Sequence, residues 1–261
     1  MIFLKLGGSL ITEKAIERKA HRAVIKRLAG EIAAYAASPQ AEPLLLGHGS
    51  GSFGHHAAAR FQTHQGASTS QDWHGVNQVW QAAAELNQIV TAAMLAAGLE
   101  AISFAPSASA MCQAGELISM AHEPISAALA AGLLPVVYGD VAFDTQQGAA
   151  IVSTEAVFSY LAEKLRPSRI LLAGLAAGIF RDYPANEDLI THFHRPDLAA
   201  SDLAGSSETD VTGGMLSKVQ FALQLKTSLP TTEIQIFSGE APEAVLAALG
   251  GAHIGTVIEA D

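Results

Sequence analysis

Apolar residues along this chain form two alternating kinds of segment. Short, nearly continuous apolar runs are typical of buried strands, and longer stretches with an apolar residue every three or four positions are typical of amphipathic helices. The runs predict strands over residues 1–6, 44–46, 101–104, 134–138, 169–173, 233–237 and 255–258. The periodic stretches predict helices over residues 21–37, 76–97, 124–131, 154–165, 219–226 and 242–249.

The alternation of strands and helices indicates an α/β fold with a mostly parallel sheet. In such sheets, ligands bind beyond the carboxyl ends of the strands. Glycine-containing turns follow four of the predicted strands, at Gly7-Gly8, residues 49–54, Gly139-Asp140 and Gly174. We therefore expect these distant turns to meet in one crevice. Two polar stretches, residues 62–73 and 182–209, are predicted to be irregular.

The composition narrows the class of protein. The chain has 261 residues, of which 49% are hydrophobic, so it can form a sizeable core and is not a disordered protein. An excess of 25 Asp and Glu over 15 Lys and Arg gives a formal charge of -10, which argues against nucleic acid as a partner. The single cysteine, Cys112, excludes an intrachain disulfide framework and favours a reducing compartment. Without a long apolar run or a signal-like start, we expect a cytoplasmic protein with no membrane partner.

Residues 47–55 carry the most specific motif. Four glycines fall within these nine residues, directly after the predicted strand at 44–46. Closely spaced glycines let backbone N–H groups surround an anion such as phosphate. His55 ends the motif, and its ring could donate a hydrogen bond to a phosphate; the alternative is a water-facing histidine at the start of a helix. The spacing is neither that of a P-loop nor that of a dinucleotide fingerprint. We expect the neighbouring His56 to face solvent.

Lysines lie near Gly-Gly pairs at both ends of the chain. Lys5 precedes Gly7-Gly8 by two residues, with Lys14 just downstream. In the second motif, residues 210–218, a Gly-Gly pair opens a helix that places Lys218 one turn in. Lysines beside exposed backbone amides suit phosphoryl transfer, which needs positive charge near the transferred group. The alternatives are surface lysines beside an ordinary tight turn and an ordinary helix start capped by Thr212.

The remaining histidines are scattered: His21, His64, His74, His122, His192, His194 and His253. None forms a helical His-x-x-x-His pair, and there is no cysteine cluster beside them. We therefore expect no zinc site and no metal-binding side chains.

Together, these motifs resemble the amino acid kinase family, and within it the isopentenyl phosphate kinase branch. The resemblance is carried by residues 5–9 with Lys14, residues 49–55, residues 138–141, and residues 210–215 with Lys218. The Gly-Ser-Phe-Gly-His segment at 51–55 is specific to that branch and to the related fosfomycin kinases. These segments occur in the family's order and are spread over nearly the whole chain.

The resemblance implies an open αβα sandwich in which one continuous sheet is shared by two parts. Residues 1–150 would bind the acceptor phosphate, and residues 151–261 would bind ATP. The implied reaction moves the γ-phosphoryl group of ATP to isopentenyl phosphate, giving isopentenyl diphosphate for isoprenoid biosynthesis. Mg²⁺ would be held largely by the nucleotide, and the protein would be a homodimer.

The resemblance also assigns roles to individual residues. The implied catalytic residues are Lys5, Lys14, His55 and Glu155. The implied acceptor-binding residues are Gly8, Ser50, Gly54, His55, Gly139, Asp140 and Ser153. The implied nucleotide-binding residues are Lys5, Gly7, Gly8, Ser9, Gly51, Gly174, Gly178, Gly213, Gly214 and Lys218.

Three positions depart from the family pattern. Glu155 stands where an aspartate is usual, and Ser50 stands where a glycine is usual. Residues 173–178 lack two acidic residues that relatives carry after this strand. Two alternatives therefore stay open: a kinase of another small phosphate or phosphonate, of the fosfomycin type, and a relative that binds a nucleotide or phosphoprenyl ligand without turnover.

Overall fold

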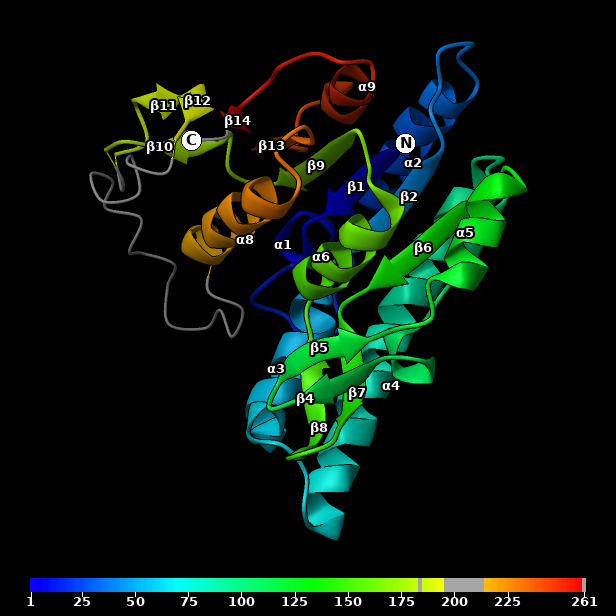
Figure 1. Ribbon diagram of the computed structural model, residues 1–261, viewed down its shortest axis with the longest axis vertical. Coiled ribbons are helices and arrows are strands. Elements are labelled where there is room, and N and C mark those ends of the chain that lie inside the picture. Colours follow the sequence, from blue (N-terminus) through cyan, green and yellow to red (C-terminus); the bar gives the residue numbers. More distant parts are fainter. Residues whose placement is uncertain (183–184, 195–213, 260–261) are drawn as a thin grey trace.

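The computed structural model describes residues 1–182, 185–194 and 214–259, and its centre is an eight-stranded sheet (Figure 1). The strand order is β12 (His192–Phe193), β14 (Thr256–Ile258), β13 (Glu233–Ser238), β9 (Arg169–Gly174), β1 (Ile2–Leu6), β2 (Leu44–His48), β6 (Leu134–Tyr138) and β3 (Ala101–Ser103). Neighbouring strands from β13 to β3 are parallel, whereas β14 runs antiparallel to β13. The predicted mostly parallel sheet is confirmed.

Helices cover both faces of this sheet, because alternate strand residues point to opposite sides. On one face, Phe3 of β1 and the strand residues on the same side of the sheet, such as Leu45 and Ile170, pack against three helices. These are α5 (Glu123–Ala130), α6 (Thr154–Leu165) and α8 (Gly214–Ser228). On the other face, Ile2 and Leu4 of β1 and their neighbours on adjacent strands pack against α2 (Arg22–Ala36), α4 (Ser70–Ala96) and α9 (Ala244–Leu249). The result is the predicted αβα sandwich with a core on each face of the sheet.

Two short loops carry the chain from the central strands into helices. The loop after β1 leads directly into α1 (Gly8–Ile11), and the loop after β2 leads into α3 (Gly51–Phe61). Both helices therefore begin at the carboxyl edge of the sheet. We predicted a helix start near His55, but α3 begins at Gly51, so His55 lies in its second turn.

A second, four-stranded sheet, which the sequence analysis did not predict, lies beyond that edge. Its order is β5 (Glu116–Ser119), β4 (Met111–Gln113), β7 (Asp140–Asp144) and β8 (Gly148–Val152). In Figure 1 it occupies the lower part of the molecule, beside α3 and α4. The Asp144 carboxylate joins its two turns by accepting hydrogen bonds from four backbone amides, those of Ala114, Gly115, Gln146 and Gln147.

Both predictions of irregular segments need correction. In 62–73, the 3-10 turn η1 spans Thr63–Gln65, and α4 already begins at Ser70. Thr69 and Asp72 form a capping box there, which satisfies amides of the first helical turn. In 182–209, β11 (Leu189–Ile190) pairs with β10 (Ile179–Phe180), and β12 joins the central sheet. Residues 183–184 and 195–209 lie outside the described part of the chain.

The 3-10 turn η2 (Pro106–Ala108) packs beside β7, near the second sheet. No helix among the described residues is both long and apolar enough to cross a membrane.

Candidate active site

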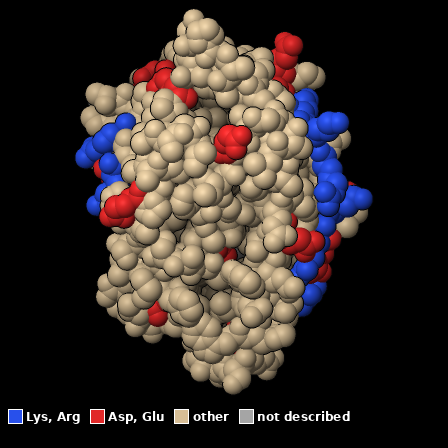
Figure 2. Space-filling model, turned by 90° about the vertical axis from the view of Figure 1, so that its right-hand side faces the viewer, with Lys and Arg blue, Asp and Glu red and all other residues tan. Residues whose placement is uncertain are grey.

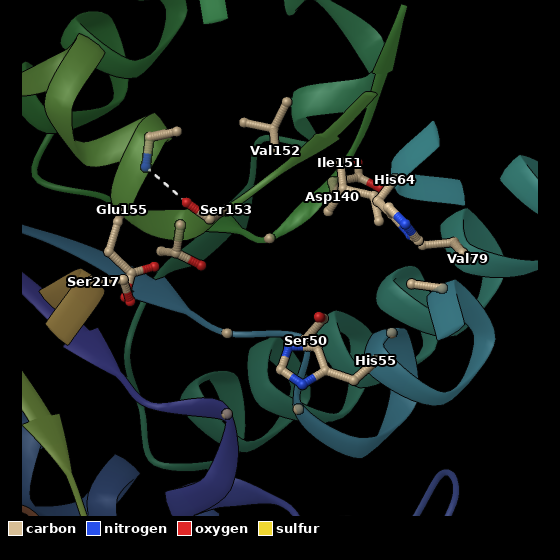
Figure 3. A pocket seen from close by; sticks show the side chains of 18 of the residues that line it. Ser50, His55, His64, Val79, Asp140, Ile151, Val152, Ser153, Glu155 and Ser217 are labelled. Atoms are coloured by element: carbon tan, nitrogen blue, oxygen red, sulfur yellow. Dashed lines mark hydrogen bonds between the residues drawn. The ribbon is translucent and has the colours of Figure 1, made fainter. Parts of the chain in front are cut away.

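A cavity of about 680 Å³ opens at the carboxyl edge of the central sheet. It is bounded by the segments that follow β1, β2, β6 and β8, and by the start of α8 (Figure 3). Of the residues assigned from the sequence, the following line it: Lys5, Gly7, Gly8, Ser9, Lys14, Ser50, Gly51, Gly54, His55, Gly139, Asp140, Ser153, Glu155 and Lys218. Three of the four turns that were expected to share one crevice meet in this cavity, whereas Gly174 lines a small adjoining pocket.

The two loops after β1 and β2 touch through glycines. A Cβ added to Gly8 would lie 2.6 Å from the Gly51 nitrogen, and one added to Gly49 would lie 2.9 Å from the Gly8 nitrogen. Gly51 also has a φ of +49°, a conformation that other residues rarely adopt. The Thr12 hydroxyl, which sequence reasoning missed, accepts from the Ser52 amide at 2.9 Å and donates to the Gly8 carbonyl at 2.7 Å. These contacts hold the backbones of the two loops against each other at the cavity.

Lys5 and Glu155 form an ion pair, and both residues line the cavity. Lys5 is only 6% exposed and extends from β1, whereas Glu155 lies in the first turn of α6. Burial alone would raise the pKa of Glu155, but the Lys5 ammonium, and to a smaller degree that of Lys218, holds it below its ordinary value. Glu155 is therefore a carboxylate at neutral pH and fixes the Lys5 ammonium at the cavity wall.

His55 and Ser50 lie together at another wall of the cavity, with the ring of His55 beside Ser50 (Figure 3). A Cβ added at Gly54 would meet the Ser50 hydroxyl oxygen at 2.4 Å. Because Ser50 stands where a glycine is usual, the absence of a side chain at 54 is what makes room for it. The serine at position 50 therefore fits without a change elsewhere, because position 54 is a glycine.

Asp140 begins β7 and is 1% exposed, yet it lines the cavity. Its Oδ2 accepts a hydrogen bond from the Ser107 amide at 3.1 Å, whereas its Oδ1 has no partner among the described residues. Burial raises the pKa of this carboxyl above its ordinary value, in spite of its hydrogen bonds with Ser107. An oxygen that is buried and unsatisfied costs free energy unless a bound group supplies a partner.

The sequence matches the amino acid kinase family model over residues 1–238. The chain belongs to the amino acid kinase family. It is 32% identical to the isopentenyl phosphate kinase of Methanothermobacter thermautotrophicus, over 97% of each chain. A structure titled as isopentenyl phosphate kinase superimposes with a TM-score of 0.84 at 29% identity, covering 99% of both chains.

A second structure, the product complex of the isopentenyl phosphate kinase of T. acidophilum, has a TM-score of 0.79 at 25% identity. It covers 99% of this chain, and this chain covers 100% of it. Amino acid kinases are ATP-using kinases, which agrees with a cavity wall that carries several lysines. The resemblance drawn from the motifs is confirmed at the level of family and fold.

The end of this amino acid kinase cavity away from Glu155 combines apolar and polar side chains. Val79 on α4 and Ile151 on β8 lie there with His64 and Asp140 (Figure 3). The cavity lining also includes Ala58, Ala150, Glu116 and Gln147. This wall was not predicted because the β7–β8 hairpin was not. The signal that could have found the hairpin is a polar turn that ends in glycine, residues 144–148, between the apolar runs 141–143 and 149–152.

Three further predictions have different outcomes. Gly174 lines a small adjoining pocket with Lys5, Glu155 and Lys218. Gly178 packs against β14, where an added Cβ would lie 2.5 Å from the Thr256 hydroxyl oxygen, and it lines neither pocket. Gly214 begins α8, and Gly213 lies outside the described residues, as does Thr212.

His56, which was predicted to face solvent, is partly exposed and also makes a contact that was not predicted. Its Nε2 lies 3.0 Å from the carbonyl oxygen of Lys14. This contact was missed because the loop that carries Lys14 folds back onto α3, and such a long-range contact has no signature in the local sequence.

Proposed function

We propose that this protein transfers the γ-phosphoryl group of ATP to isopentenyl phosphate and so forms isopentenyl diphosphate. The observation that carries the proposal is the amphipathic character of the cavity. One wall offers backbone amides of the glycine loops and the ring of His55, and the other offers Ala58, Val79 and Ile151. A phosphate joined to a short hydrocarbon chain matches that arrangement. Near-full-length similarity to isopentenyl phosphate kinases supports the same assignment.

In this proposal, the acceptor phosphate lies among the amides near Gly8, Ser50 and Gly51 and accepts a hydrogen bond from His55. Lys5, held by Glu155, and Lys14 neutralise charge on the transferred group. Phosphoryl transfer requires no covalent enzyme intermediate, so alignment and positive charge supply most of the catalysis. Gly139, Asp140 and Ser153 also line the cavity, and we assign them to the acceptor site.

The sheet supports a division of labour between the two parts of the chain. Strands β1, β2, β6 and β3 come from residues 1–150, and β9, β13, β14 and β12 come from residues 151–261. We assign the acceptor to the first half and ATP to the second, where Lys218 would contact the nucleotide phosphates. The described residues contain no cluster of three His, Cys, Asp or Glu that could hold a metal ion. We assign Mg²⁺ mainly to the nucleotide, where it would supply charge neutralisation.

The test is an ADP-release assay with ATP and Mg²⁺ that compares isopentenyl phosphate, dimethylallyl phosphate, fosfomycin and no acceptor. We expect turnover with the prenyl phosphates and none above background with fosfomycin. Preferential turnover of fosfomycin would identify a phosphonate kinase instead. If ATP bound but no acceptor reacted, the protein would be a non-catalytic member of the family.

We also propose a homodimer that forms through α4. This helix of 27 residues carries only two charged side chains, Asp72 and Glu85, and it exposes Trp73, Trp80 and Leu95. The side of the molecule where Figure 1 shows α4 and α5 has a wide centre with few charged residues, and lysines and arginines lie at its two lateral edges (Figure 2). A pair of chains, each with a formal charge of -10, would repel each other least if these faces met. Light scattering should give twice the chain mass, and Trp80→Glu should give the monomer.

A further inference from the structure

Two adjacent histidines on α3 face different parts of the site. His55 lines the cavity, whereas His56 reaches the backbone of a separate loop. The Nε2 of His56 lies 3.0 Å from the carbonyl oxygen of Lys14. A carbonyl oxygen only accepts hydrogen bonds, so Nε2 must carry the proton and donate it. One helix therefore touches both the acceptor site and the peptide unit of a lysine that lines the same cavity.

The loop that carries Lys14 connects α1 to α2. Its base is closed by a bridge between Thr12 and Ala20 and by a hydrogen bond from the Glu13 amide to the Lys19 carbonyl, 2.9 Å long. Between these ends, Lys14 is exposed. An exposed lysine on a loop loses considerable conformational entropy when its ammonium is held at one place, so something must hold its backbone.

Two ion pairs also tie this loop to neighbouring helices. Glu17 pairs with Arg60 of α3 at 2.6 Å, and Arg18 pairs with Glu85 of α4 at 3.0 Å. Their side chains are substantially exposed, so each pair contributes little to stability. The His56 hydrogen bond differs from both ion pairs because its acceptor is the backbone carbonyl of Lys14 itself.

We propose that His56 is a positioning residue for phosphoryl transfer and acts through Lys14. By donating to the Lys14 carbonyl, it fixes the backbone from which the ammonium extends into the cavity. Since His55 and His56 are neighbours on one helix, the acceptor and the cation take their positions from the same rigid element. This inference rests on the proposed function, in which Lys14 acts on the transferred group.

The first test is the kinetics of His56→Ala with ATP and isopentenyl phosphate. We expect kcat to fall roughly 3- to 10-fold, the effect of one lost hydrogen bond, with little change in KM for either substrate. His56→Gln should restore most of the activity, because the glutamine amide can donate from nearly the position of Nε2. His253→Ala is the matched control, since that exposed ring bonds to Glu233 and does not line the cavity. It should leave kcat unchanged.

The decisive comparison places His56→Ala in a Lys14→Ala background. If His56 acts through Lys14, its replacement should not lower kcat further once the ammonium is gone. Independent losses that multiply in the double variant would overturn the proposal, and so would an unchanged kcat in His56→Ala alone.

Hydrogen exchange of residues 13–19 gives a readout that needs no turnover. These amides should exchange faster in His56→Ala and at the wild-type rate in His56→Gln. Equal exchange in all three proteins would overturn the proposal that the His56 hydrogen bond holds the backbone of Lys14. A wild-type protein that phosphorylates no acceptor would contradict the proposed function and the catalytic role together. An active wild-type protein whose His56→Ala variant keeps full activity would contradict the positioning role alone.

Discussion

The replacement Gly8→Ala tests the contact between the two glycine loops. The new Cβ would lie 2.6 Å from the Gly51 nitrogen and 2.7 Å from the Gly51 Cα. This is roughly 0.8 Å inside the 3.4 Å at which ordinary contact begins. Because the opposing atoms belong to the backbone, no side chain can rotate away, and the loops after β1 and β2 must separate. A shift of about 1 Å at reacting groups can lower a rate about 100-fold. We expect kcat/KM for isopentenyl phosphate to fall by about that factor.

The same overlap should destabilise the fold by about 1–3 kcal/mol, the usual range for an overpacked site. Urea unfolding measures this free energy, and the ADP-release assay measures the rate. Gly30→Ala is the matched control, because Gly30 lies exposed within α2 and an added Cβ would meet nothing within 4 Å. That variant should keep full activity and gain up to about 1 kcal/mol of stability. A Gly8→Ala protein with wild-type activity and stability would refute the argument that these loops need glycine to form the anion site.

Four further predictions concern other contacts of the structure. His55→Ala should raise KM for isopentenyl phosphate and lower kcat, and wild-type kinetics would reject its role as a phosphate donor. Glu155→Asp should lower kcat, because the shorter side chain draws the carboxylate away from Lys5; a higher kcat would mean that the longer side chain is a compromise. The pKa of Glu155 is depressed, so the stability it contributes should be full above the ordinary carboxyl pKa and lost as pH falls through the depressed value; unfolding of wild type and Glu155→Gln across pH 3–8 tests this sign. Glu31→Ala should cost about 2–4 kcal/mol in thermal unfolding without affecting activity, since Glu31 is buried and accepts from the Val245 amide at 2.9 Å.

Seven of the eight central strands could be predicted because they are short apolar runs separated by periodic helices, whereas β12 has only two residues and lies in a polar stretch. Each strand predicted from such a run is present, with ends that differ by only a few residues. The second sheet could not be predicted in the same way. Strands such as β4 and β5 are short and largely exposed, so no apolar run marks them. Their position depends on Asp144, whose partners at 114–115 and 146–147 are separated in sequence.

Some residues of the candidate site could be predicted from the sequence, and others could not. Glycines and lysines at the carboxyl ends of central strands could be found from the sequence, because the fold brings those ends together and the residue types indicate the chemistry. Ile151 and Val79 could not be assigned, because their faces toward the cavity depend on the second sheet. Thr12 and His56 act through single hydrogen bonds to residues about forty positions away in sequence, and local pattern carries no information about such pairs.

The departures from the family pattern at Glu155 and at 173–178 have a common electrostatic basis. Glu155 lies in the first turn of α6, where the helix dipole favours negative charge, and it extends one methylene farther than aspartate toward Lys5. At Gly174, the end of β9, an added Cβ would come within 3.8 Å of the Lys218 ammonium. A segment there without carboxylates adds no further negative charge beside Lys218, whose ammonium already acts on the Glu155 carboxylate. The longer acid thus fixes the Lys5 ammonium, and the missing acids keep the surroundings of Lys218 less negative, so both changes are compatible with the proposed phosphoryl transfer.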